Sequence, residues 1–595
     1  MFLATTALSE FWDTHQEILF LGSWCLRYDR RDHWSSLAYQ VMPSPWNDRR
    51  RFFQAAAYLD ACGERFLLRL TDYLNAVHQV SYQPRYWRIL IGPWLLHFLH
   101  AAYDRYVHVT DALQREPSLT TVMLELRHPW IPPDLLAFIE AMEGDAYNLQ
   151  FFSQLFRAMG LHFPSRAPQG TWLPAPRAYV ADAGWKAWVR AAIARNSRFG
   201  EAALTRVQRR VGEVGLFDLS CPSRLMWQIV WRTRCRAFPL ALGSPQSLSN
   251  ASPRQDGRRT GLSGLAFTDE FERIVVALLP DYLPSLYLEG FEHAIATVRQ
   301  LQTTTRRMVL SASGWLFHEP FKFFAAEASE RGARLLAVQH GGGYGIYRLA
   351  PIEDHERRVA DAFVAWGWAD PGAGEAGRNL PRPNFETLLR RRIRRRGQRI
   401  LFVSTAHTRY LYRFHASPVG SQWPDYLDWQ VRFLRALPQT LRARISLRPY
   451  QQEYGHAFQE QLRSRFPNVR WDTYPSFYHQ LLRARTVVID HPGTTFLEAL
   501  VANVPTVLFW DANRWEAREE AQPYLQELRR VGVLHDSPED AADALLQAHE
   551  DPWRWWKTPE RQDVRKRFVR RYALARATWA QEWSAVLKEQ LSNNG

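Results

Sequence analysis

The sequence predicts an α/β protein with two Rossmann-like domains that face each other across a cleft. Apolar runs of strand length alternate with helical segments from Met308 to Trp366, and again from Ile400 to Asp536. Such alternation is typical of parallel sheets with crossover helices. The length of 595 residues exceeds what one hydrophobic core usually spans, which favours at least two domains.

The clearest βαβ unit is VVIDHPGTTFLEALVANVPTVLFW. Val487 to Ile489 form a short β-branched run that predicts a buried strand. Asp490, His491, Pro492 and Gly493 end this strand, and Thr494 and Thr495 begin a helix. The free backbone N–H groups at such a helix start can bind a nucleotide phosphate.

The pattern Gly493-x-Thr495-x-x-Glu498 resembles the nucleotide-sugar signature of GT-B glycosyltransferases. The resemblance implies that Gly493 and Thr495 lie beside the phosphates and that Glu498 accepts hydrogen bonds from the ribose hydroxyls. The same residues also fit a capping box, in which Glu498 bonds only the start of its own helix. The motif alone leaves both interpretations open.

The domain boundaries follow from changes in pattern. We expect an N-terminal α/β domain over residues 1–380, with strands at Leu3–Leu8 and Ile18–Gly22 and a large helical insertion over about 46–240. Leu67–Val80 and Trp185–Ala194 are amphipathic helices of that insertion, and residues 243–264 form a polar surface loop. A Rossmann-like nucleotide-binding domain over 398–552 and a helical tail over 553–595 follow; in GT-B proteins such a tail returns to the first domain.

Strands and helices within the two halves are read from the apolar runs. The predicted strands of the first half are 308–311, 335–339 and 362–366, with a helix at 320–332. The predicted strands of the second half are 400–403, 445–448, 486–490, 506–510 and 533–536, and its helices are 426–441, 453–466, 476–485, 495–504 and 519–530.

Ligands of open α/β sheets bind beyond the carboxyl ends of the strands, so we examined the residues that follow each strand. These loops contain hydroxyl, imidazole, guanidinium and glycine residues, which suit a phosphate site. We expect all of them at one cleft. The candidates are His340, Gly341, Gly342, Thr405, His407, Arg409, Arg448, Asp490, His491, Gly493, Thr494, Thr495 and Glu498.

Each candidate also has a purely structural interpretation. His340 can donate to an anionic leaving group, or it is incidental to a tight glycine turn. Arg448 can pair with a phosphate, or it forms a cap or an interdomain salt bridge. His491 can bind the ligand or pack beside Pro492. For His407 and Arg409 the structural interpretation is favoured over the functional one.

The composition and net charge indicate which kinds of partner the protein binds. The chain is 46% hydrophobic and 23% charged, as globular proteins are. Its net charge of +15 favours an anionic partner: a nucleotide, a phosphate-bearing lipid, a membrane surface or nucleic acid. The basic run at 390–399 is interpreted as a solvated linker at the seam between the halves, with contact to anionic lipid headgroups as the alternative.

Four scattered cysteines without a CxxC pair indicate reduced core residues of a cytosolic protein. The N-terminus lacks the basic region of a signal peptide, and the most apolar segment, Ile89–Tyr103, is too short to span a bilayer. We therefore expect a cytoplasmic protein that is either soluble or peripheral at the inner face of the plasma membrane.

Several classes of site have no support in the sequence. We find no DxD at a strand end, no HExxH and no cysteine cluster, so we expect no metal. The patterns GxxxxGK[ST], GxGxxG and GxSxG are also missing, so we expect no dinucleotide or other bound cofactor. A nucleic-acid-binding protein is a rival class, but no helix-turn-helix or RNA-binding aromatic signature supports it.

Longer segments carry a family resemblance across most of the chain. FLATTALSEFWD, ILFLGSWC, VQHGGGYG, and RPY followed by IDHPGTTFLEALVANVPTVLFWD resemble a bacterial transferase family of O-antigen and surface-carbohydrate loci. The QHG and RP loops are distantly similar to those of capsule enzymes that transfer Kdo from CMP-Kdo and of glycerophosphotransferases that use CDP-glycerol. RPY stands where the capsule enzymes often have an RPHP-like run.

The resemblance implies a metal-independent GT-B glycosyltransferase that moves a sugar from a nucleotide-activated donor to a surface polysaccharide or lipid-linked glycan. A CMP-linked ketosugar is one donor that it suggests, and polyol-phosphate transfer from CDP-glycerol is the alternative. His340 and Arg448 match the family's nucleotide-binding loops by position, which makes them the catalytic candidates. Together with the helix start at Thr495 they would stabilise the departing phosphate.

Overall fold

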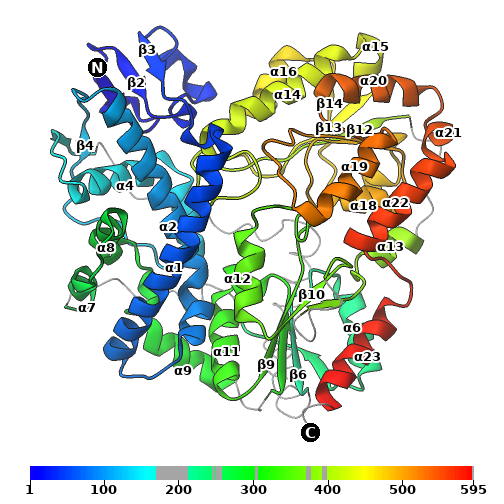
Figure 1. Cartoon of the computed structure of the whole chain (residues 1–595), viewed down its shortest axis with the longest axis horizontal. Helices are drawn as coiled ribbons and strands as arrows, with labels where there is room; N and C mark the ends of the chain where they lie inside the picture. The colour runs from blue at the N-terminus through cyan, green and yellow to red at the C-terminus, as the bar shows by residue number, and fades with distance from the viewer. Residues whose placement is uncertain are drawn as a thin grey trace, which may run out of the picture.

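The computed structural model describes residues 1–168, 212–243, 248, 257–301, 306–369, 377–390 and 398–592. Three units are apparent in Figure 1: a helical unit on the left, a first α/β unit at the lower right and a second α/β unit at the upper right. In the described residues the two α/β units each contain a six-stranded sheet, and every strand pair in both sheets is parallel.

The helical unit is organised around two long antiparallel helices. Asp48 caps the first of them by accepting from the backbone N–H groups of Arg50 and Arg51. A three-stranded parallel sheet lies beside the helices, separate from both larger sheets. The elements are β1 (Phe2–Ala4), β2 (Ile18–Phe20), β3 (Tyr39–Val41), α1 (Arg49–His78), α2 (Pro84–Arg115), β4 (Met123–Leu124), α3 (Leu135–Met142), α4 (Asp145–Ala158), β5 (Ser165–Arg166), α7 (Gly257–Thr260), α8 (Glu270–Tyr282) and α9 (Phe291–Leu301).

The first α/β unit has the strand order β11-β10-β9-β8-β6-β7. Counted along the chain from β6, this is 6-5-4-3-1-2, the doubly wound arrangement of flavodoxin-like sheets with one more strand. Its elements are β6 (Val214–Phe217), α6 (Ser223–Arg232), β7 (Ala237–Pro239), β8 (Met308–Ser311), α10 (Gly314–Phe317), α11 (Glu319–Glu330), β9 (Arg334–Val338), α12 (Pro351–Val359), β10 (Ala362–Ala365), β11 (Gly377–Asn379) and α13 (Phe385–Arg390).

The second α/β unit has the order β14-β13-β12-β15-β16-β17. Counted from β12 this is 3-2-1-4-5-6, the Rossmann order. Its elements are β12 (Ile400–Val403), α14 (Trp423–Ala436), α15 (Gln439–Arg442), β13 (Ile445–Arg448), α16 (Phe458–Arg465), β14 (Arg470–Trp471), α17 (Phe477–Leu481), β15 (Thr486–Ile489), α18 (Thr494–Ala502), β16 (Thr506–Phe509), α19 (Gln522–Arg530), β17 (Leu534–His535), α20 (Pro538–His549), α21 (Pro552–Trp556) and α22 (Pro559–Tyr572).

The C-terminal tail connects the two α/β units. Helix α22 packs on α18 and α19 of the second unit. The chain then crosses the seam, where the Leu574 N–H donates to the Trp366 carbonyl. The last helix, α23 (Trp579–Ser592), buries Trp579 and Trp583 against the strands of the first unit. This return of the tail, together with the two facing doubly wound sheets, is the GT-B-like architecture that the sequence predicts.

The helical unit contacts both α/β units. Helix α2 packs against α11 and α12 of the first unit. Toward the second unit, Arg49 forms a bidentate ion pair with Glu516, with N···O distances of 2.5 and 2.8 Å, and Arg105 donates to the Leu411 carbonyl. None of the helices that the structure describes combines the length and the apolar character that a bilayer crossing requires.

Some sequence expectations differ from the structure. Strands β6 and β7 lie inside the range predicted to be a helical insertion, because their runs of three or four residues are too short to oppose a helical pattern. Within the predicted surface loop at 243–264, residues 257–264 are helical, and Arg259 is buried in an ion pair with Glu289. The predicted helix at 185–194 and residues 391–397 of the basic run lie outside the described residues.

Candidate active site

A cavity of about 1050 Å³ lies where the three units meet. The second unit contributes the loops after β12, β13 and β15 and the start of α18. The first unit contributes Tyr347, Arg382 and Asn384, and helix α3 of the helical unit contributes Glu140 and Glu143. The volume is at the upper end of the range for small-molecule sites.

The cavity coincides with the topological switch point of the second sheet. The strand order reverses between the neighbours β12 and β15, and open α/β sheets bind their ligands outside the carboxyl ends of the strands at this point. Ser404 and Thr405 follow β12, and His491 and Gly493 follow β15. All four residues line the cavity.

The start of α18 is open toward the cavity. Gly493 is its N-cap and supplies no side-chain hydrogen bond to the first turn. Thr494 and Thr495, the first two helical residues, line the cavity. The backbone N–H groups and the helix dipole at this end favour an anion.

Contacts of both ring nitrogens hold the His491 side chain in place. Its Nδ1 lies 3.0 Å from the Asp490 carboxylate, and its Nε2 lies 3.3 Å from the Thr495 hydroxyl. Asp490 is buried and accepts hydrogen bonds from Tyr426 at 2.8 Å and Gln430 at 2.9 Å. Asp490 therefore orients His491, and it is not among the residues that line the cavity. Its role in binding the nucleotide stays a prediction.

Glu498 does not form the capping box that the motif allowed. Its Oε1 accepts from Arg382 of the first unit at 2.9 Å and from the Tyr478 hydroxyl at 2.9 Å. Burial raises the pKa of Glu498, although Arg382 and Tyr478 favour its charged form. The carboxylate lines the cavity while it joins the two α/β units through a buried ion pair.

Arg448 is a fixed cation on the cavity wall. Its guanidinium donates to Asp472 at 2.9 Å and to the Tyr474 carbonyl at 2.6 Å. These bonds hold the planar group at the end of β13, beside Phe477 and Tyr478 on the same wall. A guanidinium held in this way suits a phosphate, since it presents several donors in a fixed plane.

The glycine loop after β9 contacts the second unit directly. The Gly342 N–H donates to the Thr494 hydroxyl at 3.0 Å. A Cβ atom at position 342 would lie 2.6 Å from the Gly493 carbonyl oxygen, so the close approach of the two backbones requires glycine. Gly345 adopts a φ of +71°, and a Cβ there would meet the Trp368 ring at 2.2 Å.

His340 lies behind this glycine loop. Its Nδ1 is 3.4 Å from Glu356, and its Nε2 is 3.4 Å from the Tyr344 hydroxyl. Burial lowers the pKa of His340 to about 4, so the imidazole is neutral near pH 7. His340 is not among the residues that line the cavity, whereas Arg448 is. The meeting of these two side chains at one phosphate stays a prediction.

The structure thus divides the predicted site residues into two sets. The residues on the cavity wall are Thr405, His407, Arg448, His491, Gly493, Thr494, Thr495 and Glu498. The residues off the wall are His340, Gly341, Gly342, Arg409 and Asp490.

Arg409 has a structural role in place of the predicted ligand contact. It is 4% exposed and donates to Asp145 at the start of α4 at 2.7 Å and to the Trp24 carbonyl. The loop after β12 therefore supplies Thr405 to the cavity and uses Arg409 to hold the helical unit against the second α/β unit.

Several wall residues were not predicted. Arg382 follows β11, an edge strand of sequence GRN that has no apolar signal. Tyr347 follows the glycine loop, where its hydroxyl donates to the Pro492 carbonyl at 2.8 Å. Glu140 is on α3, and Glu143, three residues later, is the C-cap of this helix; the spacing places them on one face, but many surface helices share it.

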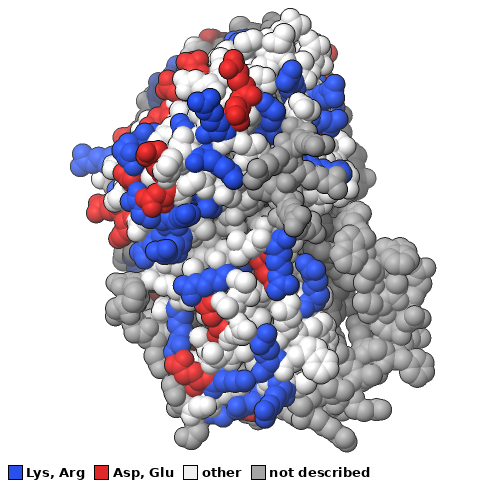
Figure 2. All heavy atoms as spheres, turned by 90° about the vertical axis from the view of Figure 1, so that its right-hand side faces the viewer, with Lys and Arg blue, Asp and Glu red and all other residues white. Residues whose placement is uncertain are grey.

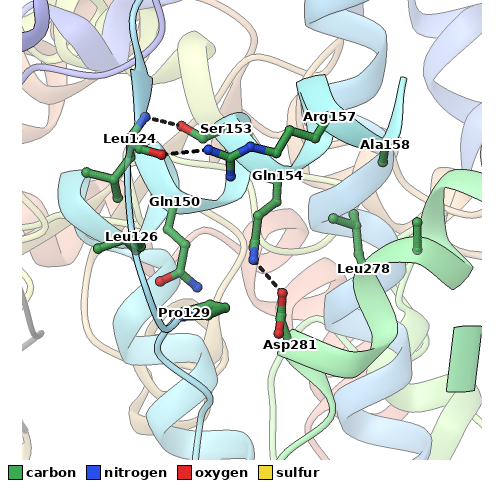
Figure 3. A pocket seen from close by; sticks show the side chains of 11 residues that line it. Leu124, Leu126, Pro129, Gln150, Ser153, Gln154, Arg157, Ala158, Leu278 and Asp281 are labelled. Atoms are coloured by element: carbon green, nitrogen blue, oxygen red, sulfur yellow. Dashed lines mark hydrogen bonds between the residues drawn. The ribbon is translucent and has the colours of Figure 1, made fainter. Parts of the chain in front are cut away.

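A separate cavity of about 410 Å³ lies inside the helical unit. Figure 3 shows that its polar side chains point toward neighbouring protein groups. Gln154 donates to Asp281 at 2.6 Å, Arg157 donates to the Leu124 carbonyl at 3.0 Å, and the Ser153 hydroxyl accepts from the Leu124 N–H at 2.7 Å. In the described part of the chain, no group of three or more His, Cys, Asp or Glu residues is placed to hold a metal ion.

A family model matches residues 1–587, nearly the whole chain, and its description is LIC12162 family transferase. The chain belongs to the LIC12162 family of transferases. No curated protein matches it.

Solved structures give weaker likenesses. The wall teichoic acid polymerase TagF is 11% identical, with 64% of this chain and 90% of that chain covered and a TM-score of 0.34. The Anabaena protein HepE in complex with UDP and glucose is 12% identical, with 63% and 99% covered and a TM-score of 0.34. A UDP-GlcNAc 2-epimerase from Neisseria meningitidis is 10% identical, with 64% and 99% covered and a TM-score of 0.35. TM-scores this low do not support a fold assignment. The strand orders of the two six-stranded sheets support it.

Proposed function

We propose that this transferase moves a sugar from a nucleotide-activated donor to a surface polysaccharide or lipid-linked glycan, and that the nucleotide binds in the cavity beside α18. The observation that carries the proposal is the coincidence of the cavity with the switch point between β12 and β15. That position is where doubly wound sheets bind nucleotides.

The donor phosphates would lie against α18. The helix start supplies N–H groups, Thr494 and Thr495 supply hydroxyl donors, and Arg448 supplies a fixed positive charge across the cavity. His407, on the same wall, has its pKa lowered to about 3 by burial, so it is neutral and can donate or accept one hydrogen bond. Glu498 and Tyr478 would meet the ribose hydroxyls.

Catalysis would consist mainly of stabilising the charge that develops on the leaving phosphate. Donors that are already in place do this most effectively, since they need no reorganisation during the reaction. The salt bridge to Asp472 and the carbonyl contact of Tyr474 hold Arg448 in such a prepared position. Arg448→Lys should lower turnover even though it keeps the charge, since lysine lacks the planar array of donors.

The acceptor would approach from the opposite wall. Glu140 of α3, Glu143 at the C-cap of this helix and Asn384 of the first unit line the same cavity as the residues of the second unit. Carboxylates on that wall can hydrogen-bond sugar hydroxyls, and one of them could accept the proton of the attacking hydroxyl. Glu140→Gln and Glu143→Gln, measured separately, test which carboxylate takes that part.

We also propose that helix α6 brings the protein to an anionic membrane surface. Trp231 is 75% exposed and Trp227 is 37% exposed, and their spacing of four residues puts them on one face of the helix. Arg232 and Arg234 follow in sequence. Figure 2 shows that Lys and Arg are more prominent than Asp and Glu over the lower half of that view. Aromatic and basic side chains together suit an interface with anionic lipid headgroups.

The experiments separate donor class from membrane binding. Incubation with CMP-, UDP-, GDP- and CDP-linked donors, followed by detection of the released nucleotide, identifies the donor; release from CDP-glycerol alone would favour polyol-phosphate transfer. Co-sedimentation with phosphatidylglycerol vesicles, and with phosphatidylcholine vesicles as control, tests the membrane surface. A Trp227→Ser/Trp231→Ser variant should lose vesicle binding and keep donor hydrolysis.

A further inference from the structure

We infer that a second cavity, between α1, α2 and α12, binds the hydrocarbon chain of an amphiphile, either an acyl or a prenyl chain. The cavity has a volume of about 280 Å³. It shares no lining residue with the nucleotide cavity, so the inference goes beyond the proposed function and stands whichever nucleotide is used.

The walls of this cavity are mostly apolar. Leu59 and Leu67 come from α1, Leu95 and Leu99 from α2, and Leu349 and Pro351 from the start of α12. An engineered apolar cavity of about 150 Å³ is enough to hold benzene. A space nearly twice that size, with walls of this kind, favours a hydrocarbon body.

Two glycines within the long helices keep the cavity open. Gly63 lies inside α1 and Gly92 inside α2, and both line the cavity. A glycine in a helix interior costs about 1 kcal/mol relative to alanine, so its presence needs a reason. At Gly63 an added Cβ would meet only the Leu99 Cδ1 at 3.8 Å. Packing therefore does not require glycine there, and the missing side chain leaves space.

Gly92 has a different function in the same wall. A Cβ at position 92 would lie 2.8 Å from Cε1 of His355, so glycine allows the imidazole to lie against α2. The His355 side chain is 6% exposed, and its Nε2 is a buried atom without a hydrogen-bond partner. Buried polar atoms are rarely left unpaired, and His355 lines the cavity.

His355 can therefore supply one hydrogen bond to a neutral ligand group. Burial lowers its pKa to about 3, so the imidazole is uncharged and can donate or accept. A hydroxyl or ether oxygen of an otherwise apolar ligand would complete its hydrogen bonding. An ordered water on Nε2 is the competing explanation, and the experiment below distinguishes the two.

Two ion pairs lie at the mouth of the cavity. Arg358 pairs with Asp60 at 2.6 Å, and Arg88 pairs with Glu64 at 2.5 Å. The side chains of Asp60, Glu64 and Arg358 are 40–53% exposed, so this rim is in contact with solvent. The two ion pairs balance each other's charge, and Asp354 adds a third carboxyl group to the lining. The rim therefore does not select an anion, and the apolar interior determines what binds.

The test uses the full chain and two ten-carbon alcohols kept below their solubility limits, decan-1-ol as the alkyl probe and geraniol as the prenyl probe. Each is titrated while the melting temperature is recorded, because a ligand that binds only the native state stabilises it by mass action. We expect a saturable rise with at least one probe. A larger rise with decan-1-ol indicates an acyl lipid, and a larger rise with geraniol indicates a prenyl-linked molecule.

Variants locate the binding. Gly63→Leu fills the cavity and should abolish the rise without lowering the melting temperature of the free protein. The matched control is Gly257→Leu, at the start of α7, where an added Cβ meets nothing within 4 Å; it should respond as the wild type does. If Gly63→Leu fails to fold, Ala57→Phe at the exposed mouth provides the second variant.

His355→Phe tests the hydrogen bond separately. It keeps an aromatic ring of similar size and should weaken binding of either alcohol about fivefold or more. No rise with either probe would overturn the inference and leave an ordered water as the partner of His355. A rise that Gly63→Leu and Ala57→Phe both retain would place the probes elsewhere and would overturn it too.

Discussion

The two α/β halves have similar sheets and use their loops differently. Each sheet has six parallel strands in a doubly wound order. In the second half, the residues at and after the ends of β12, β13 and β15 line the large cavity. In the first half, the glycine loop after β9 presses against α18 of its neighbour. Glycine-rich loops thus mark a close backbone approach, and the approaching group can be a ligand or another domain.

The difference extends to the imidazoles at the strand ends. His491, after β15, is on the cavity wall and is oriented by a buried carboxylate. His340, after β9, is near a buried carboxyl group and a tyrosine, off the wall. Sequence position at the end of a strand is the same for both residues. What differs is which surface the loop meets in the assembled molecule.

The largest expected effect concerns the ion pair that joins the halves. Arg382→Ala leaves the buried Glu498 carboxylate without its cation, which should lower the free energy of unfolding by about 3–5 kcal/mol. The control is Arg31→Ala, which removes an arginine whose side chain is 58% exposed and whose partner Asp32 is 95% exposed, and should change it by about 0.5 kcal/mol or less. Urea unfolding measures both. A small effect for Arg382→Ala would mean that the halves are not held by this pair.

The second-largest expected effect concerns how the stability of the fold depends on pH. The pKa of His340 is about 4 in the folded protein, below its value of about 6.5 in an unfolded chain. Between these values the unfolded chain binds a proton that the folded protein does not, so stability is full above pH 6.5 and falls as the pH drops toward 4. His340 should contribute up to about 3 kcal/mol of this loss.

Urea unfolding at pH 7.5, 5.5 and 4.5 tests this prediction. Other buried histidines, such as His407 in the second half, also have a lowered pKa and add to the loss. His340→Asn should therefore reduce the acid sensitivity without removing it. A variant with the same pH dependence as the wild type would show that the His340 imidazole is accessible to protons in the folded state.

A smaller effect tests the contact between the glycine loop and α18. A methyl group in Gly342→Ala would collide with the Gly493 carbonyl, and overpacking of this kind costs about 1–3 kcal/mol. Gly341→Ala is a close control, because its Cβ would meet only the Tyr344 ring at 3.4 and 3.5 Å. Thermal unfolding compares them. Equal melting temperatures would indicate that the two loops are further apart in solution.

The smallest effect concerns the phosphate site. Thr495→Val removes one hydroxyl from the start of α18 and should weaken nucleotide binding by about 1 kcal/mol, the value of one neutral hydrogen bond. Thr110→Val on α2 is the control, since its hydroxyl donates to the Tyr106 carbonyl within the same helix. Isothermal titration with the identified nucleotide measures both. Unchanged affinity in Thr495→Val would separate α18 from the phosphate.

The sequence predicted the parts of the fold that have continuous apolar runs. Strands β8, β9, β12, β13, β15 and β16 and helix α18 lie where the sequence predicts them, within one or two residues. The strands of the two large sheets that it missed, β6, β7, β11 and β14, have two to four residues, and β11 and β14 are sheet edges. Such strands are specified by the neighbours that they pair with and not by their own pattern.

The predicted residues that line the candidate site all come from the second α/β unit. Residues close in sequence to a switch-point strand, such as Thr405 and His491, are on the wall because the topology places them there. Arg382, Tyr347 and Glu140 reach the same cavity from other units, and no local pattern reports such contacts. Arg409 follows the same strand as Thr405 and was predicted for the same reason. It pairs instead with Asp145, which is 264 residues away in the chain.

The central claim is that the second half binds the nucleotide at its switch point. Hydrogen–deuterium exchange of the full chain, with and without CMP, CDP, UDP and GDP at millimolar concentration, tests it most directly. With the nucleotide that binds, we predict slower exchange in peptides that contain residues 404–407 and 490–498, and little change after β9 of the first half apart from the contact at Gly342. Protection confined to the first half, or none with any of the four nucleotides, would contradict the account.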